Sequence, residues 1–249
     1  MTDFDFEELK KVIFSLNTEV EKIKISDVDV KIKEDLSPLT KADTLVNKKL
    51  CNFVKKTNVL NVISEEEINQ SHSLRSKWKK YWVIDPIDGT KEFIKKSSDY
   101  TINIALCENS NPIFGIVSRP ATNDIYHAFK NGGAYLNGKL LKKKKQALKK
   151  TRVVASSSHL NEETKRFIEN LNKKTPIEIR NYGSSLKICK IAEGEADIYP
   201  RFAPTMEWDT CAAQIILEES GGMLTDIEMN PLKYNKKDLV NPFFIAKKI

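Results

Sequence analysis

The chain has 249 residues, a formal net charge of +7 and a pI of about 9.0. Hydrophobic residues make up 40% and charged residues 30%, which is typical of a globular protein and excludes a disordered chain. No apolar run approaches the roughly 18 residues of a membrane span, and the acidic start lacks a secretory signal pattern, so we expect no integral membrane segment. The four cysteines are scattered without a C-x-x-C pair, which favours reduced thiols and a cytoplasmic protein.

The basic charge is concentrated in one stretch of the chain. Lysines fill residues 142–145 and 149–150, and no aromatic residue alternates with them. A basic surface suits a polyanionic substrate, nucleic acid or an anionic membrane. We interpret the run as a solvated linker. A basic, nucleic-acid-binding protein is the alternative from a different functional class.

The first half of the chain has the periodicity of helices followed by strands. Apolar residues recur at helical spacing across residues 6–24, and Thr40–Asp43 has the pattern of a capping box that opens a second helix. Runs rich in β-branched and aromatic residues, separated by turn residues, predict strands at 81–84, 100–106, 113–118 and 124–129. We expect two helices packed on an antiparallel sheet.

Strands and helices alternate after the lysine run. Strands are predicted at 152–155, 177–180, 196–199, 223–226 and 243–246. Helices are predicted at 161–172, 184–193 and 210–219, the last ended by Gly221-Gly222. This alternation indicates an α/β arrangement. We therefore expect an α+β lobe over residues 1–148 and an α/β lobe over residues 149–249, with an α/β class overall.

The most informative segment is Asp-Pro-Ile-Asp-Gly-Thr at residues 85–90, directly after the apolar strand 81–84. It places two carboxylates at the end of a buried strand, next to backbone N–H groups and a hydroxyl. Magnesium prefers such oxygen ligands and commonly shares them with a substrate phosphate. The segment therefore predicts a magnesium and phosphate site. An Asx-type turn after a strand is the alternative, because Asp, Pro and Gly are ordinary turn residues.

Each residue of this segment has a physical role. Pro86 fixes its own φ and restricts Asp85 to extended geometry. We expect Ile87 to bury its side chain and to leave its carbonyl oxygen free as a third ligand. Gly89 permits positive φ and close backbone approach. Thr90 is expected to begin a short helix whose free N–H groups attract anions.

This segment resembles the signature of the lithium-sensitive, magnesium-dependent phosphatases of the inositol monophosphatase superfamily. Its continuation, Lys91-Glu92-Phe93, is similar to the 3′(2′),5′-bisphosphate nucleotidases of that superfamily. The resemblance extends over nearly the whole chain and implies the layered α-β-α-β-α sandwich of the inositol monophosphatase and sugar phosphatase type. Further matching segments, in the same order, are residues 37–43, 64–66, 183–187, 199–202 and 208–210.

The resemblance also implies a metal cluster. About two to three Mg²⁺ ions per site would be held by Glu65, Asp85, Asp88, Asp209 and the carbonyl of Ile87. Carboxylates that converge without a cation are costly, and bound Mg²⁺ offsets that cost. From the residues alone, Glu65 is explained as a first-turn acid of a helix capped by Ser64, and Asp209 as a helix N-cap.

Catalytic and substrate-binding residues follow from the same resemblance. It assigns Asp43 and Thr90 to orienting and deprotonating the attacking water, whereas the position of Asp43 alone predicts only a capping role. The segment 183–187 opens a predicted helix and suits an anion, with a glycine turn and N-cap as the alternative. The expected substrate-binding residues are Asp88, Gly89, Thr90, His159, Ser184, Lys187, Arg201 and Asp209. For His159 and Arg201 the alternatives are a structural histidine and a surface arginine.

These features predict a Mg²⁺-dependent phosphomonoesterase. It would hydrolyse the 3′-phosphate of 3′-phosphoadenosine 5′-phosphate to AMP and phosphate, which recycles a by-product of sulfate activation. An inositol-phosphate or sugar-bisphosphate phosphatase is the alternative within the superfamily. We expect a small-molecule bisphosphonucleotide as partner, no nucleic acid, and a monomer or homodimer. Peripheral association with the inner membrane is left open.

Overall fold

The structure is a computed structural model that describes residues 3–25, 30–33, 38–141, 150–155 and 161–249. In chain order the elements are α1 (Phe6–Ile25), β1 (Val30–Ile32), β2 (Pro38–Thr40), α2 (Lys41–Val54), β3 (Val62–Ser64), α3 (His72–Arg75), β4 (Lys80–Asp88), α4 (Thr90–Ile94), β5 (Thr101–Glu108), β6 (Asn111–Arg119), η1 (Pro120–Thr122), β7 (Asp124–Phe129), β8 (Gly133–Leu136), β9 (Lys139–Leu140), β10 (Thr151–Ala155), α5 (Glu162–Asn172), β11 (Ile177–Asn181), α6 (Leu186–Ala192), β12 (Ile198–Arg201), α7 (Glu207–Glu219), β13 (Gly222–Asp226) and β14 (Phe244–Lys248).

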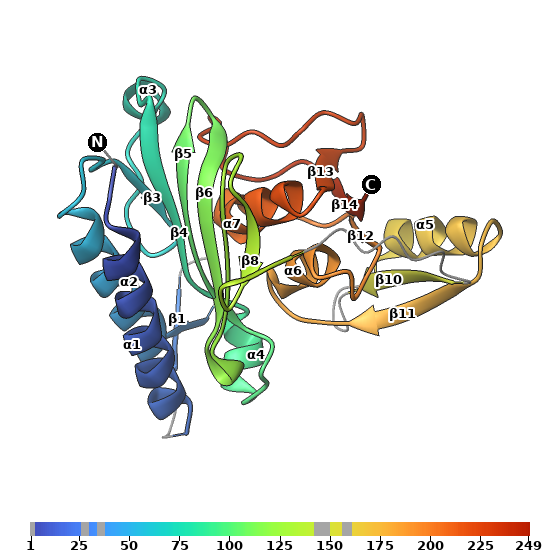
Figure 1. The fold of residues 1–249 in the computed structure, drawn as a ribbon, viewed down its shortest axis with the longest axis horizontal. Coiled ribbons are helices and arrows are strands. Elements are labelled where there is room, and N and C mark those ends of the chain that lie inside the picture. Colours follow the sequence, from blue (N-terminus) through green and yellow to red (C-terminus); the bar gives the residue numbers. More distant parts are fainter. Residues whose placement is uncertain (1–2, 26–29, 34–37, 142–149, 156–160) are drawn as a thin grey trace.

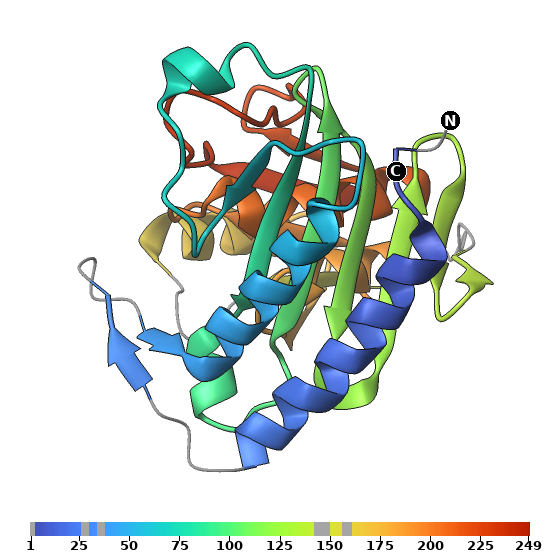
Figure 2. The same cartoon turned by 90° about the vertical axis from the view of Figure 1, so that its left-hand side faces the viewer.

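Helices and sheets alternate as layers (Figure 1). Helices α1 and α2 lie side by side on one face of a seven-stranded sheet, ordered β3-β4-β5-β6-β7-β8-β9 (Figure 2). Helices α6 and α7 separate this sheet from a five-stranded sheet, ordered β11-β10-β12-β14-β13, and α5 packs on the far side of that second sheet. The predicted α-β-α-β-α sandwich and the α/β class are confirmed.

The motif at residues 85–90 continues a strand of the larger sheet. Strand β4 runs antiparallel to β5 and parallel to β3. Asp85 pairs with Asn103 and Asp88 with Thr101, so a bulge lies between the two aspartates. Pro86 falls inside the bulge, where its missing N–H costs no ladder hydrogen bond. The strand predicted to end at residue 84 therefore extends through the motif, and the bulge supplies the expected bend.

Helix α7 is the centre of the molecule and contacts both sheets. Its residues are buried along almost the whole helix, as expected for a helix enclosed on all sides. At Gly115 on β6, an added Cβ would lie 2.6 Å from the carbonyl oxygen of Ala212. Only glycine at this position lets α7 approach the sheet so closely. Because α7 carries Asp209, this packing fixes one wall of the site.

Several boundaries differ from the sequence-based expectations. Helix α7 begins at Glu207 instead of residue 210, α6 begins at Leu186 instead of residue 184, and β12 is displaced by two residues from the predicted 196–199. No helix begins directly after Ser64, which ends β3 and is followed by a turn. The lysines at 142–145 and 149, the boundary between residues 148 and 149, and His159 lie outside the described residues. The division into two lobes stays a prediction.

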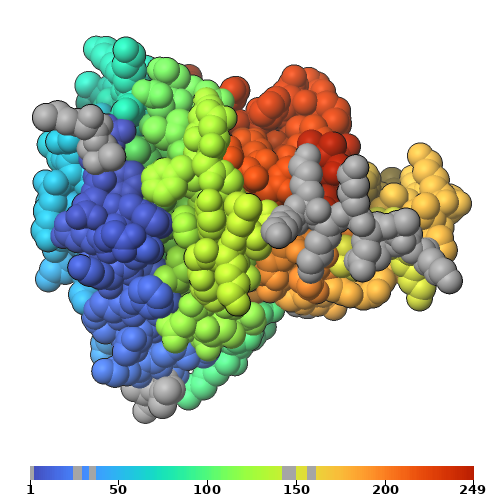
Figure 3. Space-filling model, viewed as in Figure 1, coloured from blue at the N-terminus to red at the C-terminus, as the bar shows by residue number. Residues whose placement is uncertain are grey.

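The molecule is asymmetric in outline. In Figure 3 the large sheet and its covering helices, blue to green, form a broad body, and the yellow to orange segment with α5, β10 and β11 projects from it. None of the described helices is both long enough and apolar enough to cross a bilayer.

Candidate active site

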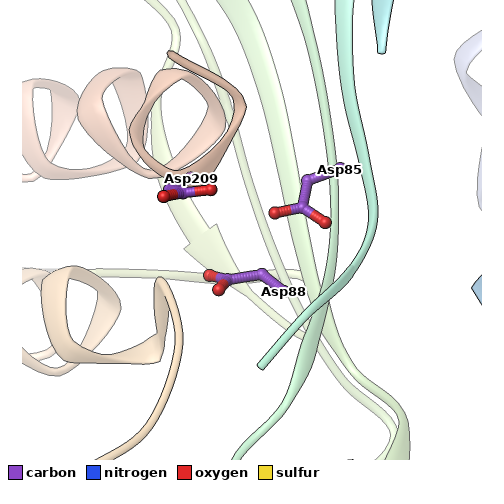
Figure 4. Close-up of side chains that lie close together, drawn as sticks. All are labelled: Asp85, Asp88 and Asp209. Carbon is purple, nitrogen blue, oxygen red and sulfur yellow. The ribbon is translucent and has the colours of Figure 1, made fainter. Parts of the chain in front are cut away.

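Three aspartates converge between β4 and α7. Asp85, Asp88 and Asp209 each offer a carboxylate oxygen, and these oxygens lie within 4.8 Å of one another. Figure 4 shows the carboxylates facing a common space. Asp85 is only 1% exposed. Its Oδ1 atom has no hydrogen-bond partner in the described part of the chain.

The electrostatics of this cluster disfavour three negative charges. Burial, followed by the neighbouring carboxylates, raises the pKa of Asp85 well above its usual range. Burial raises the pKa of Asp88 to about 6 and that of Asp209 to about 8. Buried like charges are tolerated when a cation neutralises them. The unpaired oxygen of Asp85 and the all-oxygen donor set fit a hard divalent cation such as Mg²⁺.

Backbone N–H groups hold two of these carboxylates in place. The Ser185 N–H donates a hydrogen bond to Oδ2 of Asp88. The Met206 N–H donates to Oδ2 of Asp209 at 2.9 Å. Asp209 is therefore the third residue of α7 rather than its N-cap, and the N-cap prediction is wrong. Each aspartate keeps its second oxygen for another ligand.

Glu65 lies beside this group but outside it. It follows β3, and its N–H donates to the carbonyl of Ile84 at 3.3 Å. Its Oε1 atom is 2.8 Å from Nζ of Lys33, which also pairs with Glu66. The alternative interpretation as a helix-start residue is wrong, because a turn follows Ser64. The metal-ligand role of Glu65 stays a prediction.

The side chains of Asp43 and Thr90 lie next to each other. Thr40 N–H donates to Oδ2 of Asp43 at 2.8 Å, which confirms the capping box of α2. Thr90 Oγ1 lies 3.0 Å from the carbonyl oxygen of Ile87 and 3.5 Å from Oδ1 of Asp43. The Ile87 side chain is buried as expected, and its carbonyl oxygen accepts this one hydrogen bond and keeps a second lone pair, so its role as a metal ligand stays a prediction. Burial raises the pKa of Asp43 to about 6.

A pocket opens next to the aspartates. Burial lowers the pKa of Lys187 to about 8, and its Nζ lies 5.6 Å from the ring centroid of Tyr199. Arg201 donates to the Pro204 carbonyl at 3.1 Å through Nη2, while its Nε has no partner among the described residues. The pocket thus combines two cations with the edge of the carboxylate cluster. Its lining includes the predicted residues Asp88, Gly89, Ser184, Lys187, Arg201 and Asp209.

The segment 183–185 docks onto the larger sheet. Gly183 N–H donates to Asp99 at 3.2 Å, and an added Cβ at Gly183 would lie 2.3 Å from the Asp99 carbonyl oxygen. Ser185 Oγ lies 2.9 Å from both Thr101 Oγ1 and Asn103 Oδ1. The expected glycine turn is in fact a close approach, and Ser185 makes no side-chain cap to α6. Its hydroxyl joins the two parts of the site instead.

Some site residues were not found by sequence reasoning. Lys33 forms ion pairs with Glu65 and Glu66 beside the cluster, and these partners are 32 and 33 positions away in the chain. Asn103 is a buried polar residue within the apolar strand β5. A polar residue in such a strand needs a hydrogen-bond partner, and this could have indicated a site residue from the sequence. Glu92 lines the pocket, but the sequence analysis named it only within the segment Lys91-Glu92-Phe93 and gave it no role.

Comparisons with known proteins agree with this geometry. Residues 1–245 match the inositol monophosphatase family. The chain is 37% identical to the 3′(2′),5′-bisphosphate nucleotidase CysQ of Escherichia coli (strain K12), over 87% of this chain and 88% of that protein. It is 35% identical to CysQ of Haemophilus influenzae, over 88% of this chain and 83% of that protein.

Solved structures show the same fold. The crystal structure of CysQ from Bacteroides thetaiotaomicron superposes with a TM-score of 0.84 at 34% identity and covers 98% of each chain. A structure of an IMPase/NADP phosphatase complexed with Mg²⁺ and phosphate shares the fold, with a TM-score of 0.79 at 19% identity, over 97% of this chain and 91% of that one. The range matched by the family, residues 1–245, includes the three aspartates and the cationic pocket. The chain belongs to the inositol monophosphatase family.

Proposed function

We propose that the protein is a metal-dependent 3′(2′),5′-bisphosphate nucleotidase that converts 3′-phosphoadenosine 5′-phosphate to AMP and phosphate. The observation that carries this proposal is the cluster of three aspartates, which borders directly on a pocket with two cations. The activity shared by the CysQ relatives supports it. The reaction would recycle a by-product of sulfate activation.

The carboxylates are proposed to hold Mg²⁺. Asp85, Asp88 and Asp209 already converge, while Glu65 and the carbonyl of Ile87 are proposed as further ligands at its rim. About two to three ions are expected per site, and when bound they neutralise the phosphoryl group and acidify a water molecule. Lys33 pairs with Oε1 of Glu65, so its ammonium competes with a cation for the charge of that carboxylate.

Asp43 and Thr90 are proposed to handle the attacking water. The Thr90 proton is engaged by the Ile87 carbonyl at 3.0 Å, which leaves the hydroxyl oxygen able to accept a hydrogen bond from water. Oδ1 of Asp43 lies 3.5 Å from this hydroxyl. With a pKa of about 6, Asp43 is ionised near neutral pH yet basic enough to receive a proton. Together they orient the water and take its proton.

Lys187 and Arg201 are proposed to bind the second phosphate of the substrate. Both side chains line the pocket, and neither has a carboxylate partner within 4.0 Å among the described residues. A buried ammonium without a counterion binds an anion favourably, because the phosphate restores its lost solvation. Ser184, Gly89, Asp88, Thr90 and Asp209 are the remaining proposed contacts. A contact from His159 stays a prediction.

The alternatives explain less of the site. An inositol monophosphate needs no cation pair beyond the metal cluster, whereas a bisphosphate does. A basic nucleic-acid-binding protein accounts for the net charge but not for one buried and two half-buried aspartates that face one another. We further propose a cytoplasmic location, for which the four free cysteines are suited. Whether the protein is a monomer or a homodimer stays a prediction.

Phosphate release tests the proposal. The protein is assayed with bisphosphonucleotides, nucleoside monophosphates and inositol phosphates, each with Mg²⁺ and with a chelator. We expect Mg²⁺-dependent release that is fastest with 3′-phosphoadenosine 5′-phosphate. Faster turnover of an inositol monophosphate would favour the alternative within the family, and the absence of any metal-dependent release would refute the proposal.

A further inference from the structure

A carboxylate lies in the wall of the cationic pocket. Glu92, in the first turn of α4, lines the pocket together with Lys187 and Arg201. Its Oε2 atom lies 3.3 Å from the position of a Cβ on Gly89, and its Cγ lies 3.1 Å from that of a Cβ on Gly183. The side chain therefore occupies the space between the two glycines, next to the carboxylate cluster.

The Glu92 carboxylate has no partner among the described residues. In the described part of the chain the Glu92 side chain makes no ion pair within 4.0 Å and no hydrogen bond. Its charge nevertheless acts on the site, because it raises the pKa of Asp88 and favours the protonated form of Lys187. A negative group left unpaired in a pocket for anions opposes phosphate binding at its own position. Its oxygens are available to accept a hydrogen bond from a neutral donor in the pocket.

We propose that Glu92 is a specificity residue that accepts a hydrogen bond from the substrate hydroxyl next to the scissile phosphate. Its position above Gly89 places it beside Asp88 and Thr90, the residues that surround that phosphate in the proposed function on which this inference rests. In a ribonucleotide 3′,5′-bisphosphate this hydroxyl is the 2′-hydroxyl. The same carboxylate repels a phosphate at the 2′ position when the 3′-phosphate is bound at the metal site.

A paired-substrate assay tests this inference. Values of kcat/KM are measured for 3′-phosphoadenosine 5′-phosphate and for its 2′-deoxy analogue, which lacks only the hydroxyl. A hydrogen bond to a charged group corresponds to roughly tenfold to a hundredfold discrimination. We expect the wild type to prefer the ribonucleotide by that factor and Glu92→Ala to lose the preference. Glu92→Gln keeps a carbonyl acceptor, so it should retain an intermediate preference.

The kcat/KM values of the two substrates are compared within one preparation of each variant. A misfolded fraction lowers both values equally and leaves their ratio unchanged. Glu7→Ala, in the first turn of α1 on the far side of the larger sheet, is the matched control and should keep the wild-type ratio. A wild-type ratio below about threefold, or an unchanged ratio in Glu92→Ala, would overturn the inference. If Glu92→Ala is inactive, a wild-type ratio of kcat/KM values in Glu92→Gln would also overturn the inference. Failure of the proposed function is distinct, because the wild type would then hydrolyse neither nucleotide.

Discussion

Nζ of Lys33 lies 2.8 Å from Oε1 of Glu65, so a side-chain ammonium pairs with a carboxylate that is proposed to bind metal. Lys33 follows β1 and joins the β1-β2 hairpin to the turn after β3. The ammonium also pairs with Glu66. In the absence of a divalent cation this lysine reduces the negative charge at the rim of the site. It is therefore a competitor for the same carboxylate.

Replacement of Lys33 should strengthen metal binding. Lys33→Met removes the competing ammonium, and a partly exposed ion pair is worth about 1 kcal/mol, which corresponds to roughly fivefold in affinity. Titration of the metal-free protein with Mg²⁺ by calorimetry measures this change. Lys31→Met, on the exposed strand β1, is the control and should leave the affinity unchanged. Weaker Mg²⁺ binding by Lys33→Met would show that Lys33 supports the ion.

Metal binding should depend on pH with a defined sign. The pKa of Asp88 is raised to about 6 and that of Asp209 to about 8, so the folded protein holds more protons than the unfolded chain between about pH 4 and pH 8. In a chelator the cluster's contribution to stability therefore falls as pH rises through this range. Mg²⁺ displaces these protons and removes the penalty.

Thermal melts measure this linkage. The increase in Tm caused by Mg²⁺ should be larger at pH 8 than at pH 6, because at pH 6 the ion must displace protons from the aspartates. Calorimetry in buffers of different ionisation enthalpy should show proton release on Mg²⁺ binding at pH 7. Equal Tm increases at both pH values, together with no proton release, would contradict the raised pKa values.

Asp88→Asn should separate activity from stability. The variant loses a charged ligand, and phosphate release should fall at least a thousandfold. In this variant the Ser185 N–H still has an acceptor, and a negative charge that burial disfavours is removed. The free energy of unfolding of the metal-free protein at pH 8 should therefore rise, on the order of 2 kcal/mol. Urea denaturation in a chelator measures the second effect. Asp226→Asn, on β13, serves as the control for activity. Substantial residual turnover by Asp88→Asn would place the metal site elsewhere.

Ser185→Ala should weaken the junction between the two parts of the site. Its Oγ bonds Thr101 and Asn103, and its loss leaves Asn103 Oδ1 buried without a donor. We expect a loss of about 1–3 kcal/mol in the free energy of unfolding. Ser73→Ala, at an exposed position of α3, should change the free energy of unfolding very little. A Ser185→Ala variant as stable as wild type would mean that water replaces the hydroxyl.

Lys187→Ala should affect the two classes of substrate differently. The ammonium is proposed to contact only the second phosphate, so KM should rise at least tenfold for a bisphosphate and little for a monophosphate. Steady-state kinetics with both substrates measure the difference. Lys190→Ala, whose ammonium pairs with Glu193, is the control. Equal effects of Lys187→Ala on both substrates would move the specificity site to other residues.

The local patterns of the sequence predicted most of the architecture. Helical spacing located α1 and α2, and alternating segments located β7 and β10. The motif at residues 85–90 correctly predicted a bend that brings Asp85 and Asp88 together. The capping box at Thr40–Asp43 was also confirmed. These features depend on neighbouring residues, so a single sequence contains them.

Features set by distant contacts were missed. At the start of α7, Glu207 N–H donates to the Leu239 carbonyl at 2.9 Å, a contact that no local pattern reveals. Ser64 belongs to a strand because β3 pairs with β4, although its local sequence resembles a helix start. The ion pair between Lys33 and Glu65 also joins residues that are distant in the sequence. Sequence reasoning thus predicted the three aspartates that converge, and it missed the contacts that surround them.

The most direct measurement is a crystal structure of the protein soaked with Mn²⁺, located by anomalous scattering. The account predicts a peak about 2.0–2.3 Å from carboxylate oxygens of Asp85, Asp88 and Asp209. The three side chains should keep the convergence seen in Figure 4. A fully occupied Mn²⁺ site elsewhere, or these aspartates turned apart with no ion between them, would contradict it.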